Sequence, residues 1–185
     1  MNAFIISCFV VLAWAPGLYS GQTQPARELW TKINLLPVCF EGQGDRPGHL
    51  VYVGPGKLVG ALKLVYKSGS IRCGANTAYD SRWGCYQVNG MTQFPLNVVI
   101  TDEHRNVIFP LPKNLATNGF KSGLWYYLPM TDSGHSDELV FTNYLDPFYL
   151  PKYQKLMVWY GEDLTNWYEG DDVGRVCVDV YAHML

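Results

Sequence analysis

The sequence predicts an all-β fold: a disulfide-stapled antiparallel β-sandwich of jelly-roll or Greek-key type. Two observations support this prediction. Short apolar runs alternate with clusters of Gly, Pro, Asn and Asp, which is the pattern of strands joined by turns. An even number of cysteines remains once an amino-terminal targeting segment is set aside, and paired cysteines are typical of small secreted folds.

The first 20 residues have the features of a signal peptide. The run from Ala3 to Trp14 is apolar except for Ser7, and small residues follow it. That run is shorter than the roughly 20 apolar residues that a membrane-spanning helix needs. We therefore expect a secreted protein with a signal peptide at 1–20, a single β-sandwich domain at 21–185 and no transmembrane segment.

Four cysteines follow the predicted signal peptide: Cys39, Cys73, Cys85 and Cys177. Four cysteines allow three pairings. We favour Cys73–Cys85, a local staple across a hairpin-sized loop, together with Cys39–Cys177, which would join the first strand to the last. Zinc binding is the competing use, but the irregular spacing and the lack of a Cys-x-x-Cys pair argue against it.

Seven segments combine β-branched or aromatic residues with flanking turn signals, and these are the predicted strands. They are Ile33–Phe40, Leu58–Tyr66, Leu96–Thr101, Val107–Phe109, Glu138–Thr142, Lys155–Tyr160 and Val176–Tyr181. Weaker candidates are Leu124–Leu128 and Ser70–Cys73, and the best place for a short helix is Ala26–Trp30. The polar segment 102–106 between two β-branched runs predicts a hairpin turn.

The last predicted strand has one unusual residue. Val176, Val178 and Val180 share one face, as expected for a half-buried strand, while Asp179 lies on the other. A carboxylate at that position needs either a partner or the rim of the sheet, because an unpaired buried charge is costly.

Acidic residues are concentrated near the carboxyl end. From Asp132 to Asp179 there are ten acidic and three basic residues, a local balance of −7, although the whole chain carries only −2. Carboxylate oxygens grouped on a loop are the ligands that calcium requires. The candidate calcium ligands are Glu162, Asp163, Glu169, Asp171, Asp172 and Asp179. Their spacing does not match an EF-hand, and the alternative is a solvated acidic loop.

Aromatic residues make up 15% of the chain, and three candidate ligand-binding rings flank the acidic loop: Trp159, Trp167 and Tyr168. Exposed rings offer flat apolar faces to sugar C–H groups, and neighbouring acids can bind hydroxyls. This arrangement predicts a shallow carbohydrate site. The alternative is that these rings pack in the core.

The sequence does not indicate catalysis. Glu162 and Glu169 could form a glycosidase-like acid pair, but both lie in a strongly polar segment where nothing visible raises either pKa. There is no Gly-x-Ser-x-Gly elbow and no His-Glu-x-x-His motif. We therefore expect a non-enzyme. Nucleic acid is not an expected partner, since no basic aromatic cluster stands out.

Four segments carry a resemblance to a group of secreted cnidarian proteins, some of them uncharacterised proteins of the coral skeletal organic matrix. The segments are 159–164 (WYGEDL), 174–182 (GRVCVDVYA), 63–69 (KLVYKSG) and 81–85 (SRWGC). The resemblance implies a secreted matrix protein in or near an aragonite skeleton. It supplies no catalytic residues.

Three hypotheses follow. The leading one is a secreted, non-enzymatic extracellular matrix or binding module, a calcium-associated component of a biomineral matrix, with matrix components, a mineral surface or glycans as partners. The second is a lectin-like carbohydrate-binding protein. The third is a secreted toxin or defence protein.

Overall fold

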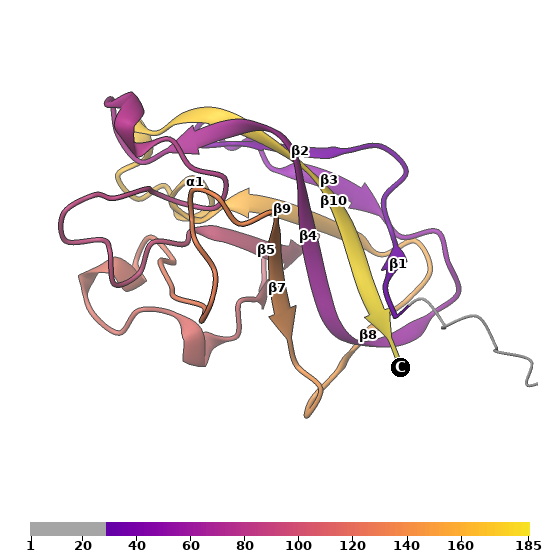
Figure 1. The fold of residues 1–185 in the computed structure, drawn as a ribbon. Coiled ribbons are helices and arrows are strands. Elements are labelled where there is room, and N and C mark those ends of the chain that lie inside the picture. The colour runs from indigo at the N-terminus through magenta and orange to yellow at the C-terminus, as the bar shows by residue number, and fades with distance from the viewer. Residues whose placement is uncertain (1–28) are drawn as a thin grey trace, which may run out of the picture.

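Two antiparallel sheets packed face to face make up the fold (Figure 1). The computed structural model describes residues 29–185. The predicted signal peptide lies outside these residues, so its boundary with the domain stays a prediction. Of the predicted helix at 26–30, only Leu29 and Trp30 are described, and neither is helical.

The first sheet is built around its two longest strands, β4 and β10, which pair from Val173↔Arg72 to Met184↔Val59. β1 and β2 pair with the free edge of β10, and β7 and β8 pair with the free edge of β4. Its six strands are β1 (Thr31–Lys32), β2 (Val38–Glu41), β4 (Lys57–Arg72), β7 (Glu138–Thr142), β8 (Phe148–Leu150) and β10 (Val173–Met184).

The second sheet has four strands in the order β3-β9-β5-β6. They are β3 (Gly48–Val51), β5 (Val98–Asp102), β6 (Val107–Phe109) and β9 (Lys155–Tyr160). β9 pairs with both β3 and β5 although it follows them by many residues, so the chain crosses repeatedly between the two sheets.

Short helices lie in the connections. They are α1 (Gly161–Thr165) and the 3₁₀ turns η1 (Thr77–Tyr79), η2 (Pro112–Asn114), η3 (Gly119–Lys121) and η4 (Glu169–Asp171). None of the helices in the described part of the chain has the length and apolar character needed to span a membrane.

The core lies between the sheets and follows the alternation of the strands. Val176, Val178 and Val180 of β10 are fully buried, as the sequence pattern predicts. Phe109 of the second sheet stacks on Phe141 of the first, with ring centroids 5.5 Å apart. Each large apolar side chain buried in this way stabilises the fold by about 1.5–3 kcal/mol.

The predicted strands agree with the structure where a strand has several β-branched or aromatic residues. β6, β7 and β9 have the predicted bounds, and the predicted hairpin at 102–106 joins β5 to β6. The prediction at Ile33–Phe40 was wrong in its first half, because the strand begins only after Pro37, which has no N–H to donate.

The two weaker strand predictions had different outcomes. Ser70–Cys73 contains the end of β4, which runs to Arg72. Leu124–Leu128 forms no strand and contributes only isolated bridges at Tyr126.

Two disulfides hold the fold, and they are the pairs that the sequence favours. Cys39 of β2 and Cys177 of β10 are directly opposite in register, and their bond spans 138 residues. In the chain-entropy model, closing so long a loop stabilises the fold by about 5 kcal/mol. Cys73 and Cys85 are bonded across the loop that follows β4.

Candidate functional site

The candidate site forms where β9 ends and α1 begins. Gly161 makes this junction possible, because a Cβ there would lie 2.8 Å from the carbonyl oxygen of Gly123. The backbone N–H of Glu162 donates to the side chain of Asn97, which fixes the start of α1. The helix ends at Asn166, whose left-handed conformation turns the chain toward Trp167. The acidic segment therefore begins as a short helix, which the sequence did not predict.

Glu162 is a buried carboxylate with one clear partner. The indole N–H of Trp125 donates to Glu162 Oε1 at 2.9 Å. Burial raises the pKa of Glu162, and the nearby Asp171 carboxylate adds to the increase. The indole hydrogen bond opposes this shift but does not cancel it.

Asp172 is the least satisfied polar group near the site. Its side chain is fully buried, and neither carboxylate oxygen has a hydrogen-bond partner among the described residues. Burial raises the pKa of Asp172 strongly, and the Glu162 and Asp171 carboxylates raise it further. Two ionised carboxylates cannot hydrogen-bond each other, so this group of acids needs either a shared proton or a cation.

A hollow of about 280 Å³ adjoins these acids. It is lined by Cys73, Met91, Phe120, Glu162, Trp167, Tyr168 and Asp171. Tyr168 is 77% exposed, and its ring meets the edge of the Trp167 ring at a centroid distance of 4.8 Å. Trp167 packs closely on Gly123, where a Cβ would lie 2.4 Å from the indole. The hollow therefore combines a fixed indole, an exposed phenol ring and two carboxylates.

Two predicted calcium ligands have structural roles instead. Asp163 is fully buried and accepts hydrogen bonds from the backbone N–H groups of Asp45 and Arg46, at 2.6 and 3.0 Å. Glu169 accepts a longer bond of 3.4 Å from the N–H of Gly44. Both carboxylates therefore hold the loop between β2 and β3 against the acidic segment.

Asp179 is not part of the candidate site. It lies seven residues beyond Asp172, which is roughly 23 Å along an extended strand. Its carboxylate forms ion pairs with Lys32 at 2.9 Å and Lys67 at 3.6 Å, and accepts a hydrogen bond from Asn34. The prediction that Asp179 joins the acidic loop does not fit this geometry, because the side chain is neutralised on the first sheet.

Trp159 is a second correction. Its side chain is only 1% exposed, and its indole N–H donates to Thr101 Oγ1 at 3.2 Å. The Arg105 guanidinium lies 4.9 Å from the ring centroid and covers it. Trp159 is therefore a core residue and cannot present a face to a sugar. The structure places Trp167 and Tyr168 at the hollow and leaves Trp159 beneath the surface.

Sequence reasoning missed the opposite wall of the hollow. Phe120 and Met91 lie in long connections without strand or helix periodicity, and Cys73 was noted only as a disulfide partner. Trp125, the hydrogen-bond donor to Glu162, lies in the segment wrongly predicted as a strand. The only available signal was the disulfide Cys73–Cys85, which tethers one of these connections beside the hollow.

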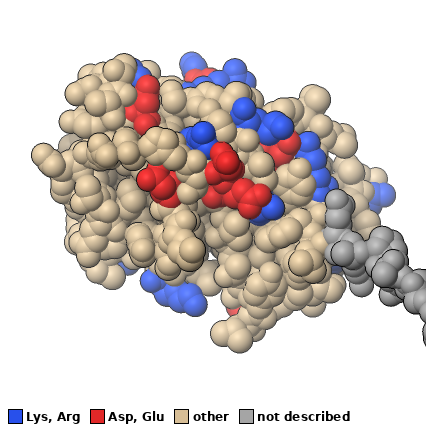
Figure 2. Space-filling view, in the orientation of Figure 1, with Lys and Arg blue, Asp and Glu red and all other residues tan. Residues whose placement is uncertain are grey.

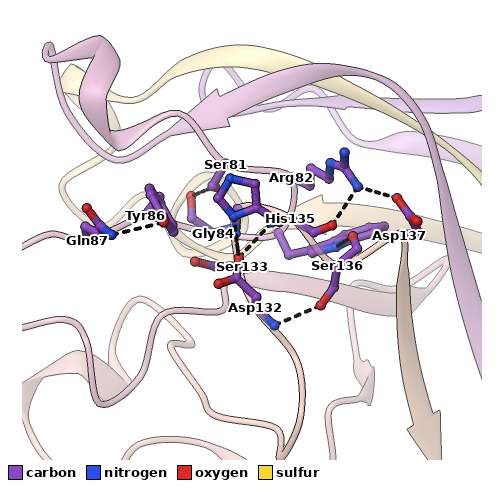
Figure 3. Close-up of polar contacts among 12 residues, drawn as sticks. Ser81, Arg82, Gly84, Tyr86, Gln87, Asp132, Ser133, His135, Ser136 and Asp137 are labelled. Carbon is purple, nitrogen blue, oxygen red and sulfur yellow. Dashed lines mark hydrogen bonds and ion pairs between the residues drawn. The ribbon is translucent and has the colours of Figure 1, made fainter.

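A second polar cluster, in the loop 132–137, satisfies its own groups (Figure 3). The Asp132 carboxylate accepts from the backbone N–H groups of Gly134 and His135. Arg82 donates to the carbonyl oxygen of His135 and to the Asp137 carboxylate. These contacts close the loop on itself, so its polar groups serve structure.

Charged side chains elsewhere are mixed. On the face that Figure 2 shows, acidic and basic groups lie beside one another across the middle of the molecule. Within residues 29–185, no group of three or more His, Cys, Asp or Glu side chains is arranged to hold a metal ion by itself. The acids at the hollow therefore provide, at most, part of a coordination shell.

These features define a class: a disulfide-stapled antiparallel β-sandwich with an acidic and aromatic hollow beside one loop. The solved structure of AJLec, from the sea anemone Anthopleura japonica, is similar to this chain over nearly the whole length of AJLec. The identity is 34%, the TM-score is 0.78, and the match covers 84% of this chain and 97% of AJLec. The chain belongs to the same family as AJLec, whose name marks it as a lectin.

Other comparisons add nothing to this match. No protein-family profile matches the chain, and no curated protein does. Because a sea anemone is a cnidarian, the match supports the cnidarian part of the resemblance. It gives no support to a skeletal matrix, to mineral partners or to biomineralisation. The disulfides and the lectin-like relative fit an extracellular protein.

Proposed function

We propose that the protein is a secreted, non-enzymatic lectin that binds carbohydrate in the hollow beside α1. The observation that carries the proposal is the pairing of the exposed Tyr168 ring and the adjacent Trp167 indole with the carboxylates of Glu162 and Asp171 around one hollow. The family relationship to AJLec supports the same class of ligand.

The chemistry of the hollow suits a sugar. Aromatic faces pack against the C–H groups of a pyranose, while carboxylate oxygens accept hydrogen bonds from its hydroxyls. The volume of about 280 Å³ is at the small end of ligand sites. A terminal sugar residue therefore fits better than the interior of a long polysaccharide.

We also infer that Glu162, Asp171 and Asp172 supply part of the ligand shell of a calcium ion, which these three side chains do not complete by themselves. The support is the buried Asp172 carboxylate, whose two oxygens have no hydrogen-bond partner among the described residues. A cation would remove the repulsion between these carboxylates. Calcium takes six to eight oxygen ligands, so backbone carbonyls, water or sugar hydroxyls would complete the shell. A bound cation would supply positive charge and open positions for those hydroxyls.

The sugar proposal is tested by removing the exposed ring. Tyr168 has a left-handed backbone (φ 53°), a conformation that asparagine tolerates well. We expect Tyr168→Asn to weaken glycan binding by about tenfold, since stacking on one ring is lost. Binding is first identified on a glycan array and then measured by titration calorimetry.

The chain offers a matched control for this experiment. Tyr153 is also exposed and left-handed (φ 70°), and it does not line the hollow. Tyr153→Asn should leave glycan affinity unchanged. An array without any bound glycan, or an equal loss in both variants, would contradict the proposed site.

The calcium proposal is tested separately by thermal unfolding in EDTA and in increasing calcium, with magnesium as the control ion. Calcium at 100 times its Kd should add about 2.7 kcal/mol, a shift of a few degrees. Asp172→Asn should lose the calcium response, because the amide cannot supply the negative charge that holds the ion. If calcium does not change the melting temperature, the calcium proposal is rejected and the proposed sugar site is unaffected.

A further inference from the structure

The end of the sandwich away from α1 carries an exposed apolar surface. Leu35 and Leu36, in the loop between β1 and β2, are 83% and 79% exposed. Val51 at the end of β3 and Val53 just beyond it are also exposed. These four residues are termed the apolar end face. In Figure 1 the β1–β2 loop and β3 lie at the opposite end of the molecule from α1.

Leu35 borders two hollows, and Leu36 lines one of them. One, of about 250 Å³, lies on the side of β1 and of residues 52–57, and the other, of about 400 Å³, lies over β3. Leu35 and Val53 border both. The exposed leucines and valines therefore border these hollows, and their apolar side chains are free to contact a partner surface.

The charges around the apolar end face are basic. Lys32 and Lys57 line the first hollow and His49 lines the second, while none of the Asp or Glu residues within 29–185 lines either. Lys155 of β9 lies directly opposite Val51 in register, and both side chains are exposed. Basic groups also predominate in the upper right of Figure 2, over this end of the molecule.

The nearby Asp179 carboxylate does not make the net charge of this surface negative. Asp179 is buried and forms ion pairs with both Lys32 and Lys67. Asp179 therefore offsets one of these two lysines, while Lys57 is exposed and Lys155 has Asp102 on the neighbouring strand, opposite Leu156. The surface is locally positive although the whole chain is negative.

We propose that the apolar end face docks on an anionic lipid bilayer. Leu35 and Leu36 insert between the headgroups, while Lys57 and Lys155 lie at the level of the lipid phosphates. Projecting apolar side chains surrounded by basic residues are the chemistry of interfacial membrane binding. A second copy of the chain fits less well, because a symmetric pair would bring like charges together.

The experiment is flotation of the protein with vesicles of phosphatidylcholine alone and of phosphatidylcholine with phosphatidylglycerol. We expect binding to the anionic vesicles, weakened by high salt because the screening length shortens. Leu35→Ser combined with Leu36→Ser should weaken binding by at least about tenfold. The combination of Lys57→Glu and Lys155→Glu should abolish the preference for anionic vesicles.

Met130→Ser is the matched control. Met130 is a fully exposed apolar residue in another loop and lines neither hollow. This variant should float with anionic vesicles as the wild type does. All the substituted side chains are exposed, so the variants should melt like the wild type.

Three results would overturn the proposal. The first is failure to bind either kind of vesicle. The second is binding that the double serine variant leaves unchanged. The third is a dimer by light scattering that the double serine variant dissociates, since the apolar end face would then be covered by a second copy. Lipid binding and glycan binding are measured separately, so neither result decides the other.

Discussion

Asp179 illustrates how a buried carboxylate is made stable by its neighbours. Burial alone would raise the pKa of Asp179, but hydrogen bonds from Lys32 and Asn34 and the charges of Lys32 and Lys67 outweigh it. The pKa therefore lies below its ordinary value. A lowered pKa in the folded state means that the contribution to stability is present above the unfolded-state pKa of about 4, and is lost as the pH falls through the folded-state pKa.

This behaviour gives a prediction at the residue scale. Asp179→Asn should lower the free energy of unfolding at pH 7 by about 2 kcal/mol, because charge-assisted hydrogen bonds are lost. The difference from the wild type should shrink at pH 3 and below. Urea unfolding at both pH values measures it.

The matched control for Asp179→Asn is Glu138→Gln. Glu138 forms a more exposed ion pair, with Lys63, so this variant should cost less than about 1 kcal/mol. A difference between Asp179→Asn and the wild type that is equally large at both pH values would contradict the role assigned to Asp179.

The acidic residues also show what a sequence can and cannot reveal about a site. The grouping of Glu162, Asp171 and Asp172 on one segment was predictable, because a run of acids is visible without a structure; their role as ligands stays a prediction. Whether a carboxylate is already engaged in hydrogen bonds or ion pairs cannot be read from the sequence. Asp163 accepts from the backbone of a loop more than 100 residues away, and Asp179 meets lysines from two other strands. Such partners depend on the fold.

At the scale of elements, the pairing of β4 and β10 depends on close backbone approaches at two glycines, Gly69 and Gly174. Gly174 has a φ of +114°, and a Cβ there would lie 2.2 Å from the carbonyl oxygen of Ser70 on β4. An L side chain rarely adopts this conformation, and the clash is with backbone that cannot move aside without opening the sheet. Because β10 begins directly after Asp172, this contact also fixes where the acidic segment ends.

The prediction is that Gly174→Ala destabilises the protein by about 2–3 kcal/mol or more, measured by thermal unfolding. Gly170→Ala is the control, since a Cβ at Gly170 meets nothing within 4 Å. It should change stability by less than about 0.5 kcal/mol. Equal melting of the two variants would show that the β4–β10 contact tolerates a side chain.

Strands were predictable from their residue pattern more than from their length, since the two longest, β4 and β10, extend well beyond their predicted bounds. β6, β7 and β9 have β-branched or aromatic runs between turn signals, and their bounds were predicted. β1, β3 and β8 have two to four residues each, too few to show alternation. The walls of the hollow come from connections such as those holding Met91 and Phe120, where tertiary packing alone decides the conformation.

At the scale of the whole molecule, two surfaces of different chemistry lie at opposite ends of the sandwich. The hollow beside α1 is acidic and aromatic, and the apolar end face is aliphatic and basic. The rigid sheets between them keep the two apart. A lectin built in this way would present its sugar site away from the bilayer on which it rests.

The position of β10 has a consequence for how the protein folds during its synthesis. β10 lies in the interior of the first sheet, between β4 on one side and β1 and β2 on the other, and it follows all of them in the chain. During translation β1, β2 and β4 emerge first. Their edges stay unpaired until β10, which begins more than 100 residues after β4 ends, has been synthesised. Such non-local pairing is slow and leaves the nascent chain prone to aggregation. The sheet and its long-range disulfide can therefore close only after β10 has left the ribosome, so chaperones that shield unpaired strand edges should increase the yield of folded protein.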